Sequence, residues 1–186
     1  MDEPSVTATE NLVMAAALAE GRTTLHNAAC EPHVSGLCRM LVMMGCKIEG
    51  IGTNRLLIDG QSSLKGGEHT IGVDFMEVGS FLCLGAIGKG KVSITNVNVE
   101  DMRFPLNVFG RIGVSPTIDG TTLTIDGTRQ MNMKREVSGR IGNIYSGPWP
   151  AFPSDLMSVA IIAATQSHGT MVFFEKMYES RMLSLI

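Results

Sequence analysis

An internal repeat runs through this chain of 186 residues. Residues 57–60 read Leu-Ile-Asp-Gly and residues 124–127 read Thr-Ile-Asp-Gly, an offset of 67 residues between equivalent positions. Upstream, the glycine-led segments that begin at Gly21 and Gly90 match each other with an offset of 69 residues. Repeats at a fixed spacing are typical of stacked supersecondary units that bury one another's apolar faces. The sequence therefore predicts equivalent structural units.

A third copy of the pattern begins at Gly169, and the sequence reaches Ile186 before that copy is complete. We therefore expect one partial domain over residues 1–186, and we expect part of the working protein to lie outside this sequence. Its expected parts are repeat one over 1–66, repeat two over 67–127, a polar connector over 128–142 and a partial repeat three over 143–186.

The composition indicates a globular protein with a core, since 44% of the residues are hydrophobic and 18% are charged. The net charge of −3, without a basic block, argues against nucleic-acid binding, because phosphate neutralisation needs clustered Lys and Arg. We recognise no signal peptide and no membrane-spanning stretch, so we expect a cytoplasmic protein without membrane contact. Free thiols are favoured over a metal site for the four cysteines, which share no CxxC or CxxH spacing: Cys30, Cys38, Cys46 and Cys83.

Local patterns predict the same order of elements in each whole repeat: helix, strand, helix and two strands. In repeat one, Ser5, Thr7 or Thr9 could each cap the first helix, and Pro32 suits the first turn of the second. We expect in repeat one a helix that ends at Gly21, a strand over 23–28, a helix that begins at residues 31–32 and stops at Gly45, and a hairpin of 47–49 with 56–58.

In repeat two, Asp74 and Glu77 have the spacing of a capping box, and Pro105 is expected to kink or shorten the second helix. We expect there a helix over 78–87, a strand over 92–97, a helix over 100–109 and a hairpin of 117–118 with 123–125. In repeat three, Ser154 is expected to cap a helix that runs through residue 164, and a strand follows over 170–175. A further strand is expected before the first helix of each repeat.

Three such units would close into an α/β domain with the sheets outside and the helices packed at the centre. Small residues in the first helix of each unit suit close helix packing: Ala15, Ala16, Ala17, Gly79, Ala160, Ala163 and Ala164.

Two side chains carry the candidate chemistry, since the sequence has no P-loop, Rossmann glycine cluster, nucleophile elbow or zinc signature. A proline-rich turn over residues 150–153 delivers Asp155 to the first turn of the expected helix, where the helix dipole favours a carboxylate that accepts a proton or a substrate hydroxyl. Acidic residues at helix starts are also commonplace without any function. Arg181 has two interpretations as well, a surface charge or an anion-binding group.

The motifs together resemble the UDP-N-acetylglucosamine enolpyruvyl transferase (1-carboxyvinyltransferase) branch of the enolpyruvyl transferase family. The resemblance covers nearly the whole chain in order, and its motifs lie at residues 4–11, 17–21, 27–32, 44–48, 150–156 and 179–182. It implies the inside-out α/β barrel of that family, with two domains of three repeats each. It also implies that this chain holds the middle and later part of the enzyme.

The same resemblance implies site residues and partners. Asp155 matches the carboxylate that binds the sugar 3-hydroxyl and acts as its base, and Ser5 and Val6 match the segment that touches the uridine diphosphate. Met177 and Arg181 match positions on the substrate-binding side. The implied substrates are UDP-N-acetylglucosamine and phosphoenolpyruvate, used in peptidoglycan precursor synthesis. The implied partner is the missing domain of the same enzyme, without which the chain is expected to be inactive, and neither a metal nor an organic cofactor is implied.

Two rival functions stay open at this point. A shikimate-pathway enolpyruvyl transferase would share the fold, although the motifs at 27–32 and 150–155 favour the sugar enzyme. A non-catalytic nucleotide-sugar-binding paralogue would suit two departures from the family pattern. These are Thr7 in place of a glycine and the lack of an arginine after Asp74.

Overall fold

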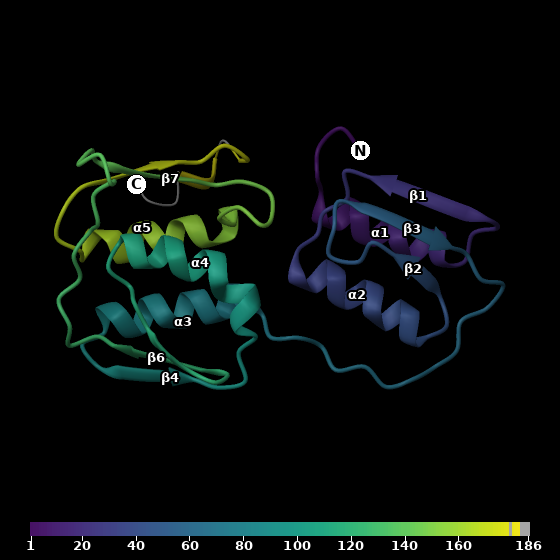
Figure 1. Ribbon diagram of the computed structural model, residues 1–186, viewed down its shortest axis with the longest axis horizontal. Coiled ribbons are helices and arrows are strands. Elements are labelled where there is room, and N and C mark those ends of the chain that lie inside the picture. The colour runs from purple at the N-terminus through teal and green to yellow at the C-terminus, as the bar shows by residue number, and fades with distance from the viewer. Residues whose placement is uncertain (179, 183–186) are drawn as a thin grey trace. The chain divides into compact units, whose positions relative to one another are not determined.

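The computed structural model describes residues 1–178 and 180–182, and the chain forms two compact units, Met1–Gly72 and Val73–Ile186. Each unit combines helices with small sheets, so the expected α/β class is confirmed (Figure 1). No helix in the described part of the chain has the length and apolar character that crossing a membrane needs.

The first unit is a three-stranded antiparallel sheet with two helices packed against it (Figure 1). Its strands pair in the order β1–β3–β2, and the core holds alternate residues of β3, Leu56 and Ile58, which are buried against the helices. Pro32 opens the second helix, where a missing N–H costs nothing. The elements are α1 (Val6–Ala17), β1 (Arg22–His26), α2 (Pro32–Met43), β2 (Lys47–Glu49) and β3 (Arg55–Asp59).

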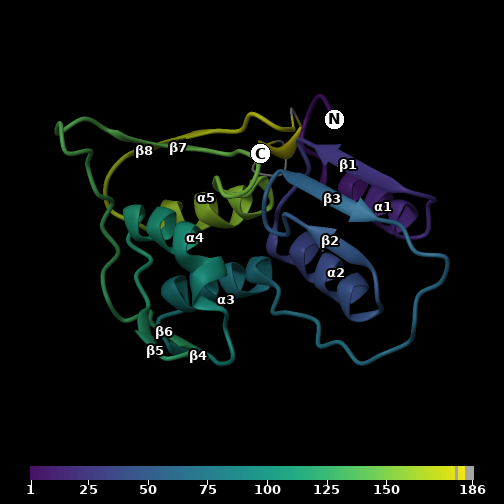
Figure 2. The same cartoon turned by 45° about the vertical axis from the view of Figure 1, so that its right-hand side comes forward.

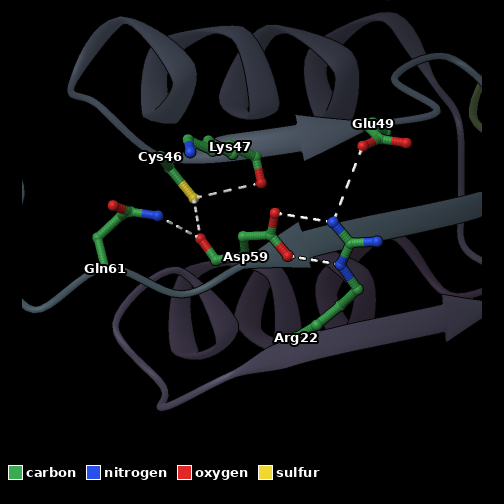
Figure 3. A network of polar contacts seen from close by, with 6 residues as sticks. All are labelled: Arg22, Cys46, Lys47, Glu49, Asp59 and Gln61. Carbon is green, nitrogen blue, oxygen red and sulfur yellow. Dashed lines mark hydrogen bonds and ion pairs between the residues drawn. The ribbon is translucent and has the colours of Figure 1, made fainter.

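A network of polar contacts surrounds Asp59 at the end of β3 (Figure 3). Asp59 lies directly opposite Arg22 in the β1–β3 ladder, and the arginine donates two hydrogen bonds to its carboxylate, Nε to Oδ1 at 2.6 Å and Nη2 to Oδ2 at 2.9 Å. Gln61 and the Cys46 thiol donate to the backbone carbonyl of Asp59 at 2.8 and 3.8 Å. The network thus ties the chain that leaves β3 to both neighbouring strands.

The second unit holds three helices between two sheets, as Figures 1 and 2 both show. One sheet is antiparallel in the order β4–β6–β5, and the other is the parallel pair β7–β8. The elements are α3 (Phe75–Ile87), β4 (Lys91–Ile94), α4 (Val99–Arg111), β5 (Thr117–Asp119), β6 (Thr122–Asp126), β7 (Gly142–Tyr145), the 3₁₀ turn η1 (Ser154–Leu156), α5 (Met157–Thr165) and β8 (Met171–Phe174).

The core of this unit positions η1. Leu156 is fully buried and packs over Gly79 of α3, where an added Cβ would come within 2.9 Å of the leucine Cδ2 and 3.1 Å of the Phe109 ring. Phe109 in turn meets Phe152 edge to face, with ring centroids 5.7 Å apart. The small residue in α3 therefore lets the proline-rich turn and η1 seat their apolar side chains in the helical core.

The predicted order of helix, strand, helix and two strands recurs in both whole repeats, and the strand order β1–β3–β2 returns as β4–β6–β5. Pairing register repeats as well, since Arg22 faces Asp59 in the first sheet and Lys91 faces Asp126 in the second. Two of the predicted cap residues are confirmed as N-caps: the Ser5 side chain accepts a hydrogen bond from the Ala8 N–H, and the Asp74 side chain accepts one from the Met76 N–H. The second bond of the capping box predicted for Asp74 and Glu77 stays a prediction.

Several local expectations are wrong. Pro105 does not shorten α4, which runs on to Arg111, because burial of Met102, Val108 and Phe109 outweighs one lost backbone hydrogen bond. The first helix ends at Ala17, ahead of Gly21. Residues 1–5 and 60–74 hold no strand, so the strand expected before each first helix occurs in the third repeat as β7 and not in the first two.

The expected start of α5 is wrong too. Ser154 does not cap this helix; residues 154–156 form a 3₁₀ turn, and α5 begins at Met157. The physical reason is a competing acceptor, because the Ser154 hydroxyl donates to the Glu175 carboxylate at 2.8 Å.

Candidate functional site

Asp155 lies in η1, at the exit of the proline-rich turn. Its neighbours Ser154 and Leu156 are buried, while 56% of the Asp155 side chain is exposed. The turn is held by the backbone, since the Leu156 N–H donates to the Pro153 carbonyl at 3.1 Å and the Ala151 N–H to the Pro148 carbonyl at 2.9 Å. The buried neighbours Ser154 and Leu156 thus hold the turn in place on either side of Asp155, while its carboxylate stays accessible to a ligand.

Arg181 meets Asp155. The arginine Nη1 lies 2.6 Å from Asp155 Oδ1, and 29% of the arginine side chain is exposed. Its guanidinium also lies over the Tyr178 ring, 5.0 Å from the centroid, and its N–H donates to the Tyr178 carbonyl at 3.1 Å. Two residues selected from separate motifs therefore form one charged pair, and the exposed part of the Asp155 carboxylate can still accept a hydrogen bond from a substrate hydroxyl.

Glu175, which follows β8, is the residue that sequence reasoning missed. Its Oε1 accepts hydrogen bonds from the Ser146 hydroxyl at 2.8 Å, the Met177 N–H at 2.7 Å and the Tyr178 N–H at 3.3 Å. Its Oε2 accepts one from the Ser154 hydroxyl. Nothing in the local sequence distinguishes Glu175 from a surface glutamate, because its two side-chain donors, Ser146 and Ser154, lie 29 and 21 residues away in the chain.

The Glu175 carboxylate is held in its charged form. Burial by itself raises the pKa of this group, but the hydrogen bonds from Met177, Ser146, Ser154 and Tyr178 together outweigh that effect, and the pKa lies below its usual value. Ser146 and Ser154 are both buried, so their hydroxyls would lack an acceptor without this carboxylate. Glu175 is therefore the centre of a satisfied polar cluster, here called the Glu175 cluster, formed by these five residues.

The other predicted site residues are placed as follows. Met177 belongs to the Glu175 cluster through its backbone, and the residue is 37% exposed. Ser5 and Val6 lie in the first unit, where Ser5 is the N-cap of α1 and Val6 is the first helical residue. Val6 is half-buried. The N-terminus of a helix favours an anion through its N–H groups and dipole, and in α1 no acidic side chain of the first turn takes that place.

Within the described residues, no three His, Cys, Asp or Glu side chains come together as a metal site requires. The second-unit site offers three charged groups: a carboxylate that can accept a proton or a hydroxyl, an arginine beside it, and a second carboxylate that accepts hydrogen bonds from the backbone around them.

A family model described as EPSP synthase (3-phosphoshikimate 1-carboxyvinyltransferase) matches residues 1–183. Similar curated proteins are the UDP-N-acetylglucosamine 1-carboxyvinyltransferases of Treponema denticola, 51% identical over 183 residues, Borreliella burgdorferi, 47% over 182, and Treponema pallidum, 46% over 183. Each of these alignments covers 98% of this chain and 43% of the relative. The chain thus spans less than half the length of the relatives it matches.

Among solved structures, the enolpyruvyl transferase NikO from Streptomyces tendae superposes with a TM-score of 0.75. The superposition covers 91% of this chain and 39% of that chain, at 18% sequence identity. At this identity the likeness concerns the fold, and it agrees with the arrangement of repeated helices and sheets described above.

Proposed function

This chain belongs to the EPSP synthase family of 1-carboxyvinyltransferases, and on that premise we propose that it is part of an enzyme that acts on UDP-N-acetylglucosamine. The reaction transfers the enolpyruvyl group of phosphoenolpyruvate to the sugar 3-hydroxyl and releases phosphate, as a step of peptidoglycan precursor synthesis. The observation that carries the proposal is the Asp155–Arg181 pair, which joins two residues of the matching motifs at 2.6 Å.

The choice of substrate rests on the named relatives. Proteins that are 46–51% identical over nearly this whole chain carry the name UDP-N-acetylglucosamine 1-carboxyvinyltransferase. The family description names the phosphoshikimate reaction, but it covers the family as a whole, so the individual relatives are the more specific guide.

In this proposal the repeats belong to the inside-out α/β barrel of the family. The second unit supports it, because its helices lie between two sheets (Figure 2). The remaining part of the enzyme would be the partner that completes the active site, and it would supply the acid and the groups that hold the phosphate of phosphoenolpyruvate.

Asp155 is proposed to accept the proton of the sugar 3-hydroxyl as that oxygen attacks the enolpyruvyl carbon. Arg181 occupies Oδ1 of the carboxylate and orients it, and the exposed part of Asp155 receives the hydroxyl. As the C–O bond forms, the hydroxyl proton moves to the carboxylate, the C=C bond of the enolpyruvyl group opens, and its CH₂ carbon takes a proton from the acid of the remaining part of the enzyme. In the later step the resulting methyl group loses a proton, the double bond re-forms, and phosphate leaves as its C–O bond breaks. A positioned general base of this kind contributes about 10²–10⁴-fold to a rate.

Met177 is proposed to contact the nucleotide sugar from the same segment as Arg181, which its exposed side chain permits. Ser5 and Val6 are proposed to bind the diphosphate, since they form the N-terminus of α1 and its dipole favours negative charge. No metal or organic cofactor is required by these roles. We place the reaction in the cytoplasm, where Cys38, Cys46 and Cys83 would persist as the free thiols that they are in the structure.

The test compares the chain alone with a complete enzyme, made by exchanging this chain for the matching span of the Treponema denticola relative. We expect the complete enzyme to release phosphate from phosphoenolpyruvate with UDP-N-acetylglucosamine and not with 3-phosphoshikimate. The chain alone should show no turnover above background, because half of the reacting groups are absent and positioning supplies much of the rate.

Three results would contradict the proposal. Turnover with 3-phosphoshikimate would identify the shikimate-pathway reaction. Calorimetric binding of UDP-N-acetylglucosamine by a complete enzyme without turnover would identify a non-catalytic paralogue. Phosphate release by the chain alone would show that its own residues include the acid.

A further inference from the structure

We propose that Glu175 is a positioning residue, whose carboxylate fastens the turn that carries Asp155 to the segment that carries Arg181 and so sets the geometry of the Asp155–Arg181 pair. The role in geometry concerns this chain alone. The consequence for catalysis rests on the proposed function, and the experiments below separate the two.

The donors to Glu175 come from both sides of the site. Ser154 is the residue before Asp155, and Ser146 follows β7 at the start of the same turn. Met177 and Tyr178 belong to the other side, and the Tyr178 carbonyl accepts the N–H of Arg181 at 3.1 Å. One carboxylate thus bonds directly to the neighbour of the proposed base and, through one residue, to the arginine that orients it.

Ser146 strengthens the connection between the two sides. Its hydroxyl donates to Glu175 Oε1 and accepts the Lys176 N–H at 3.0 Å, while its backbone N–H donates to the Phe174 carbonyl at 3.1 Å. Phe174 and Lys176 are therefore bonded to Ser146. The next two residues, Met177 and Tyr178, are bonded to the carboxylate that Ser146 contacts. The pairing of β7 with β8 ends at Tyr145 and Phe174, and the hydrogen bond from the Ser146 N–H to the Phe174 carbonyl extends it by one residue into the Glu175 cluster.

A carboxylate is the side chain that suits this place. It offers acceptor sites on both oxygens and no donor, and its partners here are all donors. Glutamine has the same shape but replaces one oxygen with an NH₂ group and removes the charge. It can therefore keep part of the cluster only with weaker bonds, because hydrogen bonds to charged groups exceed neutral ones.

The Asp155–Arg181 pair needs such a support. Asp155 is more than half exposed, and exposed ion pairs by themselves hold long side chains only weakly. The Glu175 cluster is instead partly buried and built on backbone N–H groups, so it can fix the two chain segments before the ion pair forms. In this proposal the geometry of the Asp155–Arg181 pair depends on the Glu175 cluster, and the cluster does not depend on the pair.

The first experiment uses the chain itself. Amide hydrogen exchange and the Arg181 Nε–H signal are recorded by NMR for the unchanged chain, for Glu175→Gln and for the control Glu136→Gln. Glu136 is also a carboxylate of the second unit, and its Oε1 contacts Arg111 Nη2 at 2.8 Å. We expect Glu175→Gln to speed exchange at Met177 and Tyr178 by about tenfold, which is the difference between a charged and a neutral acceptor, and to shift the Arg181 signal. Glu136→Gln should change neither.

The inference would be overturned by an unmoved Arg181 signal in Glu175→Gln, or by faster exchange that extends equally through α5 and the β4–β6–β5 sheet. The first result would show that the pair forms without the cluster. The second would show that Glu175 stabilises the unit in general.

The second experiment measures the kinetics of the complete enzyme described above. We expect Glu175→Gln to lower kcat by about tenfold with little change in the KM for phosphoenolpyruvate, because a misplaced base slows the chemical step. An unchanged kcat beside a shifted Arg181 signal would overturn the catalytic part of the inference. A complete enzyme without turnover would contradict the proposed function, whereas the NMR result on the chain would still decide the role of Glu175.

Discussion

Two arginine–carboxylate pairs, one in each unit, have the same closest distance between charged atoms, but different backbone structures hold their residues in place. Arg22 Nε lies 2.6 Å from Asp59 Oδ1 in the first unit, and Arg181 Nη1 lies 2.6 Å from Asp155 Oδ1 in the second. The first pair joins residues that face each other in the β1–β3 ladder (Figure 3). The second joins a 3₁₀ turn to a segment beyond β8, and in the described part of the chain no strand pairing connects those two segments.

The difference in support implies a difference in role. Arg22 and Asp59 are placed by strand register, which the repeat reproduces as Lys91 and Asp126, so this pair is a feature of the repeating scaffold. Asp155 and Arg181 are placed by turns and by a carboxylate outside the repeat pattern. A charged pair set by irregular backbone, with its carboxylate open to ligands, is the arrangement expected of a functional group.

Activity should separate the two carboxylates most strongly. In the complete enzyme, Asp155→Asn should lower kcat by about 10²–10⁴-fold because the proposed general base is lost, while Asp59→Asn should leave kcat unchanged. Steady-state kinetics with UDP-N-acetylglucosamine measures both, beside thermal unfolding of each variant. Near-normal turnover with a collapsed melting temperature in Asp155→Asn would mean that this carboxylate is a structural cap.

Removing the core anchor beside Asp155 should have the next largest effect. Leu156→Ala empties a fully buried site above Gly79, and we expect it to destabilise the second unit by about 2–5 kcal/mol. The matched control is Ile118→Ala on β5, where the residue is 54% exposed and the change should stay within about 0.5 kcal/mol. Urea unfolding measures both values, and equal effects would show that η1 is not anchored by the core.

Acid should loosen the Glu175 cluster. The pKa of Glu175 in the folded chain lies below its usual value of 4.5, so the carboxylate contributes stability that is full above that value. The contribution is lost as the pH falls through the lower folded value. Exchange at the Met177 and Tyr178 amides, corrected for its intrinsic pH dependence, should therefore stay slow from pH 7 down to the usual carboxyl value of 4.5 and accelerate only below it. Acceleration already near pH 6 would contradict this assignment.

The smallest expected effect concerns the scaffold pair. Hydrogen bonding to Arg22 and the charge of that arginine lower the pKa of Asp59, but 53% of the Arg22 side chain and 34% of the Asp59 side chain are exposed, so water and salt screen the attraction. Arg22→Ala should therefore shift the denaturant midpoint of the first unit only slightly, and less at 1 M salt than at low salt. A large shift that salt does not reduce would show that the pair supports the sheet as strongly as its apolar core does.

Much of the scaffold follows from the sequence. The repeat, the order of elements, the hairpins and the helix caps at Ser5 and Asp74 depend on neighbouring residues and on apolar periodicity, which are local properties. Pro105 and Ser154 show the limit of local rules. In one case burial held a helix together across a proline, and in the other a distant acceptor drew a serine away from the helix it was expected to cap.

Residue type and spacing along the chain were enough to predict the repeating α/β scaffold and to select Asp155 and Arg181 as candidate groups. The folded chain was needed to see that these two groups meet, that η1 precedes α5, and that Glu175 joins their segments. Local sequence could not show this, because a carboxylate accepts hydrogen bonds from whichever donors lie around it. For Glu175 those donors come from two parts of the chain that only the packing of β7, β8 and η1 brings together.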